Sequence, residues 1–489
     1  MPDKSATKPR TSRPSAKREE GAAGVARPPA PDKLTLRAYN VGFGDCFLLT
    51  FHYPDFNRRV LIDFGSTSAP PKADAKYMLN VALDIREQCR DAGGAAKLDA
   101  VVVTHRHSDH ISGFSTKGDG TGKIIASLKP DVVIQPWTED PNAQPDATSA
   151  TTTTYTGGKP DAKAFIATLK SMQAVAAAVA RESRNPHLGL GKKSAEQLHF
   201  LGDDNLTNKS AVENLMQMGQ AARAAYVNCG SVSGLEAVLP GVTVRVLGPP
   251  TLVQTEAIRK ERARDPQEFW QFCAYWRFQA GAGASPAGAR VFPGAPVYSQ
   301  EKMPPRTRWF VSRAQKVRAS ELLQLVRELD TAMNNTSVIL LFEAGGKKLL
   351  FPGDAQIENW AYALHQPQFQ ELLKDVLVYK VGHHGSLNAT PQSLWALFAR
   401  KREQEAPGRL QTVLSTKPGK HGSVQSDTEV PRRTLVAELQ KESDFFSTQT
   451  LPKAEICKQF EFDLGRQMED GGPTTQPAAK RGLTGKAHA

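Results

Sequence analysis

The chemistry of this chain is concentrated in one run of six residues, HRHSDH, at positions 105–110. His105, His107, Asp109 and His110 offer four donors of the kind that bind zinc and similar divalent ions. A set this dense would be costly in an ordinary core, because each polar group would need a buried partner. His105 and His107 can converge on one ion, while Asp109 and His110, just beyond them, can turn toward a second. The run therefore predicts a metal centre.

The stretches around this run indicate how it is positioned. An apolar stretch at 98–104 comes directly before it and predicts a buried strand. Further β-rich stretches, turn residues and helical patterns alternate along the chain. We expect strands at 34–41, 46–52, 59–62, 98–104, 132–135, 242–247, 337–343, 348–351, 376–381, 412–415 and 460–464, and helices at 75–89, 161–182, 211–226 and 432–441. This order predicts an α/β protein whose site residues lie at strand ends.

Two later motifs follow predicted strands and carry further side chains that bind metals. Asp354 lies in LLFPGDAQ at 349–356, and the pair His383 and His384 lies in YKVGHHGS at 379–386. Alone, the first motif would be an ordinary turn and the second a loop. In series with the histidine cluster, both become candidates for the same centre.

Taken in order, these motifs resemble those of the metallo-β-lactamase superfamily, whose hallmark is HxHxDH after a hydrophobic strand. NVGFGDCFLL at 40–49 and VLIDFG at 60–65 resemble the opening strands of that fold. The nearest similarity is to the ComEC-type hydrolase domains, which are associated with DNA internalisation. The resemblance covers 34–464 and implies an αββα metallo-β-lactamase sandwich with two large insertions. We place these insertions at about 139–239 and 251–330.

The resemblance also implies roles for the site residues. The expected metal ligands are His105, His107, Asp109, His110, Asp354 and His383. His383 is preferred to His384 because it is nearer to the strand end, and His384 is expected to contact substrate or support the ligands. Asp109 is expected to orient the attacking hydroxide, and Asp354 to bridge the metals. Two further carboxylates are expected to form turns or to support the ligands: Asp45 and Asp63.

One ligand of the complete superfamily pattern is missing. Members with the full set carry a third histidine on the first metal, between HxHxDH and the bridging aspartate. Only His187 and His199 occur in this interval, and neither follows an expected core strand. ComEC-type domains have an Asn/Ser block there, which Asn334, Asn335 and Ser337 resemble, so water or Asn335 would complete the site. An oxygen-richer site would take Mn²⁺ as well as Zn²⁺.

The implied activity is hydrolysis by a hydroxide held between two zinc ions about 3.5–4 Å apart. The ions lower the pKa of the bound water from about 15.7 toward ~7. The leading expectation is a phosphodiesterase or nuclease acting on nucleic acid. A basic segment supports it, with Trp309 and Phe310 as stacking groups among Lys302, Arg306, Arg308, Arg313, Lys316 and Arg318. One alternative is a hydrolase of a small thioester, lactone or phosphoester. Another is a catalytically weak metal-binding scaffold.

Bulk properties set the remaining expectations. The net charge is +12, but half of the excess lies in Ala- and Pro-rich tails at 1–33 and 465–489, which we expect to be disordered. Five widely spaced cysteines argue against a disulfide framework and predict reduced, mostly buried thiols. No apolar run has the ~20 residues of a membrane span, and no secretory signal begins the chain. We therefore expect a cytoplasmic protein with no membrane partner; the sequence indicates no particular protein partner.

Overall fold

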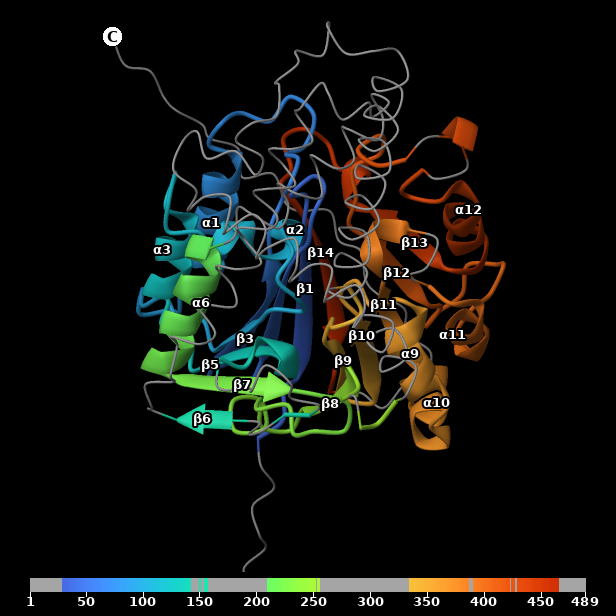
Figure 1. The fold of residues 1–489 in the computed structure, drawn as a ribbon, viewed down its shortest axis with the longest axis horizontal. Coiled ribbons are helices and arrows are strands. Elements are labelled where there is room, and N and C mark those ends of the chain that lie inside the picture. The colour runs from blue at the N-terminus through green and yellow to red at the C-terminus, as the bar shows by residue number, and fades with distance from the viewer. Residues whose placement is uncertain are drawn as a thin grey trace, which may run out of the picture.

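The computed structural model of the chain describes most of the residues on both sides of two long gaps. The described residues are 29–141, 149–150, 154–156 (backbone only), 209–251, 253–255, 334–386, 390–422, 424–426 and 429–465. They form a mixed α/β structure with two multi-stranded sheets, drawn in Figure 1.

The first sheet has eight strands in the order β14-β1-β2-β3-β4-β5-β7-β6. Its strands are β1 (Lys33–Tyr39), β2 (Cys46–His52), β3 (Asn57–Phe64), β4 (Ala100–Val102), β5 (Val132–Pro136), β6 (Thr154–Thr156), β7 (Arg223–Val227) and β14 (Cys457–Asp463). β3, β4, β5 and β7 run parallel to one another, so their carboxyl ends meet at one edge. The first and last strands of the described chain are neighbours in this sheet, because β1 pairs with β14.

The second sheet has six strands in the order β13-β12-β11-β10-β9-β8. Its strands are β8 (Thr243–Gly248), β9 (Ile339–Ala344), β10 (Lys347–Phe351), β11 (Val376–Lys380), β12 (Gln411–Leu414) and β13 (Asp444–Ser447). β10 to β13 are parallel. A Gly345-Gly346 turn joins β9 to β10, and both glycines have positive φ angles, which glycine adopts without steric cost.

Most strands are buried on both faces, and residues that alternate along a strand belong to different cores. One face of each sheet contributes to a shared core, which includes Leu36, Leu49, Val102, Phe342 and Phe351. The other faces pack against helices, α1 (Tyr77–Gln88), α3 (Thr121–Ser127) and α6 (Lys209–Ala221) on the first sheet, and α9 (Ile357–Leu364), α10 (Pro367–Lys374), α11 (Gln392–Leu397) and α12 (Arg433–Glu442) on the second. Figure 1 shows the two helix sets on opposite sides, with the sheets between them.

Several elements differ from the sequence-based predictions. The helix predicted at 211–226 ends at Ala221, and β7 follows immediately, parallel to β5. The alanine-rich composition of this stretch favours helix locally, but pairing with a buried strand overrides such a preference. Helices α9, α10 and α11 and strand β13 were not predicted. β6 lies within the Thr-rich stretch at 141–160, for which no strand was predicted.

Both expected insertions lie partly outside the described residues. Of the first, 142–148, 151–153 and 157–208 are outside, including the helix predicted at 161–182. Of the second, 252 and 256–330 are outside. The later part of the first expected insertion, 209–239, contributes α6 and β7 to the first sheet and its helical layer. The basic segment with Lys302, Arg306, Arg308 and Arg313 lies outside the described residues, as do the tails at 1–28 and 466–489.

Two general expectations concern membranes and cysteines. In the part of the chain that the structure describes, the helices are all too short or too polar to cross a membrane. Cys46, Cys89 and Cys229 are buried free thiols and Cys457 is half-buried, while Cys273 lies outside the described residues.

Candidate metal centre

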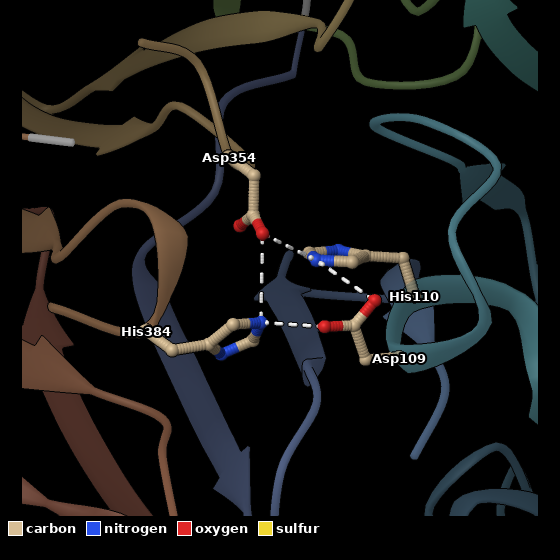
Figure 2. A group of neighbouring side chains, drawn as sticks. All are labelled: Asp109, His110, Asp354 and His384. Carbon is tan, nitrogen blue, oxygen red and sulfur yellow. Dashed lines mark hydrogen bonds and ion pairs between the residues drawn. The ribbon is translucent and has the colours of Figure 1, made fainter. Parts of the chain in front are cut away.

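The polar residues singled out in the sequence come together where parallel strands of the two sheets end. The run at 105–110 follows β4, and its last residues form the one-turn helix α2 (Ser108–Ile111). Asp354 follows β10, and His384 follows β11 in the short 3₁₀ helix η5 (His383–Gly385). Figure 2 shows Asp109, His110, Asp354 and His384 pointing toward one another. One ligand atom from each lies within 4.8 Å of the others, and all four residues are buried.

The imidazole nitrogens and carboxylate oxygens of these four residues lie close to one another. His384 Nε2 is 3.0 Å from Asp109 Oδ2 and 3.5 Å from Asp354 Oδ2. His110 Nε2 is 3.2 Å from Asp354 Oδ2 and 3.9 Å from Asp109 Oδ1. Asp109 Oδ1 is buried without a hydrogen bond to any described residue, and so is Asp354 Oδ1, although the Lys380 ammonium lies 3.5 Å from the latter. Such oxygens are costly unless another group binds them, so the donor set fits a divalent cation.

His105 and His107 lie beside this group. The two rings contact each other, with 3.0 Å between His105 Nε2 and His107 Nδ1, and the centroid of the His105 ring is 4.1 Å from that of His110. Burial lowers the pKa of both imidazoles, that of His107 to about 4. Both rings are therefore neutral at pH 7, the form in which imidazole binds metals. The structure thus brings five of the six predicted ligands together: His105, His107, Asp109, His110 and Asp354.

The sixth predicted ligand, His383, lies at the edge of this group. Its Nε2 is 4.0 Å from Asp354 Oδ2, its Nδ1 contacts Ser386 Oγ at 2.9 Å, and a quarter of its side chain is exposed. His384 is fully buried, and its Nδ1 donates to the Ser415 carbonyl at 2.9 Å. That hydrogen bond directs Nε2 of His384 into the cluster. The geometry therefore favours His384 as the ligand and His383 as its neighbour at the surface.

The backbone at this pair is itself unusual. His383 has a φ of +40° and His384 a φ of +51°, in the left-handed region that residues with a Cβ rarely adopt. Each such residue costs about 1–3 kcal/mol, and strain of this kind is concentrated at functional sites. The turn gives the two consecutive imidazoles different surroundings, with His384 buried and His383 a quarter exposed, and residue types alone do not show which of them is the ligand.

Asp63 orients His110. Its carboxylate accepts hydrogen bonds from Thr104 N at 2.8 Å, Thr104 Oγ1 at 2.7 Å and His110 Nδ1 at 2.8 Å. With Nδ1 engaged in this way, His110 presents Nε2 to Asp354 and Asp109, the arrangement usual for a metal-binding histidine. Of the two roles considered for Asp63, the structure favours support of a ligand.

Asp45 contacts a residue that the sequence analysis did not identify, Lys380. The ammonium group of Lys380 forms an ion pair with Asp45 Oδ2, lies 3.1 Å from the Gly353 carbonyl oxygen and 3.5 Å from Asp354 Oδ1, and is almost completely buried. A sequence signal existed, because Lys380 ends the apolar strand β11, where a charge requires a buried partner.

The electrostatics favour positive charge in the cluster. Burial alone would lower the pKa of His110 and His384, but the surrounding carboxylates, Asp354 above all, raise both. Burial would raise the pKa of Asp109 and Asp354, but the nearby imidazoles hold both well below the usual range. Metal ions and protons compete for the same histidine nitrogens in such sites.

A further histidine lies near the cluster and was also missed. The ring of Phe43 is 4.4 Å from that of His384 and 4.4 Å from that of His421. Burial lowers the pKa of His421 to about 4, opposed by the charge of Asp109. A lone histidine in a Gly- and Lys-rich loop gives little sequence signal, because nothing in its neighbours indicates a partner.

The Asn/Ser block supports the backbone beside Asp354. Ser337 Oγ accepts from Asp354 N at 3.2 Å, and Asn335 Nδ2 donates to Glu358 at 3.1 Å. Asn335 and Asn334 are both buried. His187 and His199 lie outside the described residues.

The comparisons with known proteins assign no family. A search with protein-family models found none that matches the chain, and a search of curated proteins found no similar sequence. What the site can do is therefore inferred from its geometry: a buried set of carboxylates and imidazoles, drawn from both sheets, that could hold a divalent metal ion.

Proposed function

We propose that this chain is a metal-dependent hydrolase of the metallo-β-lactamase type. One observation carries the proposal. Residues up to 275 positions apart, Asp109 and His384 among them, meet in a buried group whose ligand atoms lie within 4.8 Å. They come from the motifs in which the superfamily has its ligands.

The arrangement of layers supports the same family. Two sheets share one core, and helices cover both outer faces, as expected for an αββα metallo-β-lactamase sandwich. The candidate ligands lie at the carboxyl ends of β4, β10 and β11, where loops are free to carry chemistry while the strands fix their positions. We therefore propose this specific fold within the α/β class.

The ligand set we propose is His105, His107, Asp109, His110, Asp354 and His384, holding two zinc ions, or manganese ions in their place. Bound ions of this kind supply Lewis-acid activation of water and of the bond to be broken. Asp109 Oδ2 and His384 Nε2, which are 3.0 Å apart, would both bind the ion, and Asp109 Oδ1, without a hydrogen bond to a described residue, would be left to orient a water. The ring of Phe43, buried against that of His384, limits solvent on that side and strengthens these interactions.

The substrate class we propose is a phosphodiester in nucleic acid. It is supported by the ComEC-type resemblance of the motifs and by the basic residues of the sequence at 302–318. The metal centre itself is compatible with any ester or thioester whose carbonyl or phosphoryl oxygen it could polarise. Substrate assays on one preparation therefore need to include both polymeric and small substrates.

The test is hydrolysis by purified protein stripped with chelator and then reloaded with Zn²⁺ or Mn²⁺. Single-stranded DNA, double-stranded DNA, RNA and bis(p-nitrophenyl) phosphate would be assayed beside a thioester and a lactone. We expect metal-dependent cleavage of the phosphodiesters. Asp109→Ala and His110→Ala should each abolish it, while the far-ultraviolet circular dichroism stays that of the parent.

The control is His365→Asn, since His365 lies on the C-terminal end of α9, outside the cluster, and should leave turnover unchanged. Near-parental turnover of Asp109→Ala with its metal depleted would overturn the proposed mechanism. Cleavage of the small thioester or lactone alone would replace the substrate class and keep the hydrolase. Less than one ion per chain in the parent, with no turnover, would replace both with a scaffold role.

A further inference from the structure

Lys380 occupies an unusual position for a lysine. Its side chain is 2% exposed, and its ammonium group faces two carboxylates, Asp45 and Asp354. The Gly353 carbonyl oxygen, 3.1 Å from Nζ, accepts a hydrogen bond from it. An ion pair buried this deeply adds little to stability, because desolvation of the charges offsets their attraction. A reason other than stability is therefore needed for the charge at this position.

The partners of Lys380 belong to both halves of the metal centre. Lys380 ends β11 in the second sheet, and Gly353 and Asp354 follow β10 in the same sheet. Asp45 lies between β1 and β2 of the first sheet, and its backbone N–H donates to the Asp109 carbonyl at 2.9 Å. A continuous path of contacts thus joins Asp354 to Asp109 through Lys380 and Asp45.

The contacts also divide the two oxygens of Asp354. Oδ1 is 3.5 Å from Lys380 Nζ, whereas Oδ2 is 3.2 Å from His110 Nε2 and 3.5 Å from His384 Nε2. An ammonium on one oxygen turns the other toward the imidazoles. Rotation of this carboxylate would exchange the two oxygens, and Lys380 opposes that rotation.

We propose that Lys380 is a positioning residue of the metal centre, which with Asp45 fixes the separation and orientation of Asp109 and Asp354. The role rests on the proposed metal site, but not on which substrate that site hydrolyses. Lys380 itself would touch neither the metal nor the substrate. Its effect would reach the ions through the Asp354 carboxylate directly, and through Asp45 and the backbone of Asp109.

The two consequences of removing Lys380 have opposite signs, which makes the experiment decisive. Loss of a positive charge beside the cluster would by itself strengthen the binding of divalent cations. Loss of a group that orients ligands weakens metal binding, by about 10–100-fold for supporting residues in general. The positioning role requires the second effect to dominate.

The experiment measures Zn²⁺ and Mn²⁺ affinity by competition with a chromogenic chelator, in the parent chain, in Lys380→Met and in the double variant Asp45→Asn with Lys380→Met. The double variant removes both charges of the pair and avoids an unpaired buried carboxylate at Asp45. Thermal unfolding of the metal-free proteins reports on the fold separately. Co²⁺ absorption spectra report the geometry of the ligands.

We expect both variants to bind metal at least tenfold more weakly, with an altered Co²⁺ spectrum, and the double variant to melt close to the parent. Lys348→Met is the matched control, because Lys348 is a mostly buried lysine on the neighbouring strand whose partner, Asp375, is exposed. Parental or stronger metal affinity in the double variant would overturn the role of Lys380 and leave the proposed hydrolase intact. Absence of metal binding in the parent would overturn both.

Discussion

Asp63 and His110 are joined by a hydrogen bond of 2.8 Å between Oδ2 and Nδ1, although 47 residues separate them. The bond connects the end of β3 to the short helix after the neighbouring parallel strand β4. It fixes which ring nitrogen of His110 faces the cluster. The relationship makes Asp63 a residue whose loss should be measurable at the metal centre.

Asp63→Asn should weaken metal binding by about 10–100-fold, because the charged acceptor for His110 Nδ1 is removed. Affinity would be measured by calorimetric titration with Zn²⁺ or Mn²⁺. Asp84→Asn is the matched control, since Asp84 also accepts hydrogen bonds from a tyrosine and an arginine but lies on α1, away from the cluster. Equal losses in the two variants would show that the effect is on the fold and not on His110.

The two neighbouring histidines should differ sharply. His384→Ala should reduce metal affinity by at least 100-fold, because a ligand is removed outright, whereas His383→Ala should reduce it by less than tenfold. The measurement is the metal content of each variant after dialysis against a buffered low concentration of Zn²⁺. The reverse order would restore the assignment that the sequence suggested, with His383 as the ligand.

Metal should stabilise the folded chain. A ligand that binds only the folded state at 100 times its dissociation constant adds about 2.7 kcal/mol. The melting temperature should therefore rise by several degrees with Zn²⁺ or Mn²⁺ and fall again with chelator. Asp354→Asn should remove most of this shift. A rise of the same size in that variant would place the ion elsewhere on the chain.

His421 should make the fold sensitive to acid. Its pKa in the folded chain, about 4, lies below the usual value of 6.5, so the unfolded chain takes up this proton more readily. Stability from neutral His421 is complete above about pH 6.5 and is lost as pH falls toward 4. The metal-free parent should therefore lose more melting temperature between pH 7 and pH 5 than His421→Asn does. Equal losses would show that His421 does not titrate in this window.

The basic segment provides the test of the substrate class. Replacing Arg306, Arg308 and Arg313 with alanine should weaken nucleic-acid binding and flatten its dependence on salt, by about one unit of slope for each of these arginines that pairs with a phosphate. Turnover of a small chromogenic phosphodiester should survive. Equal loss on both substrates would mean that the segment supports the fold. If the parent shows no salt-dependent binding, the nucleic-acid proposal fails.

Much of the candidate site could be predicted from the sequence because its donors are dense and follow apolar strands. The run at 105–110 and Asp354 are examples, since each comes directly after a buried strand. Which of His383 and His384 faces the cluster could not be predicted, because it depends on two left-handed backbone conformations that the residue types do not require. The charge of Lys380 at the end of an apolar strand is visible in the sequence, but its partners, like the neighbours of His421, become apparent only when segments distant in the sequence meet.

The elements of the fold also divide into those that local sequence patterns predict and those that depend on distant pairing. Strands with alternating or continuous apolar residues were predictable, as β2 and β11 illustrate. The helix expected at 211–226 was wrong over its last five residues, because pairing with β5 determines the conformation there and leaves no trace in local periodicity. The helices between β10 and β12 are short and amphipathic over eight residues or fewer, too few for a clear pattern.

The distribution of the candidate ligands over both sheets has a thermodynamic consequence. An ion bound by Asp109 and His384 would close a loop of 275 residues. Closing so long a loop removes conformational freedom from the unfolded chain, as a cross-link does, and the entropy removed grows only slowly with loop length. Reversible binding of an ion would thus act as a reversible cross-link between the two sheets.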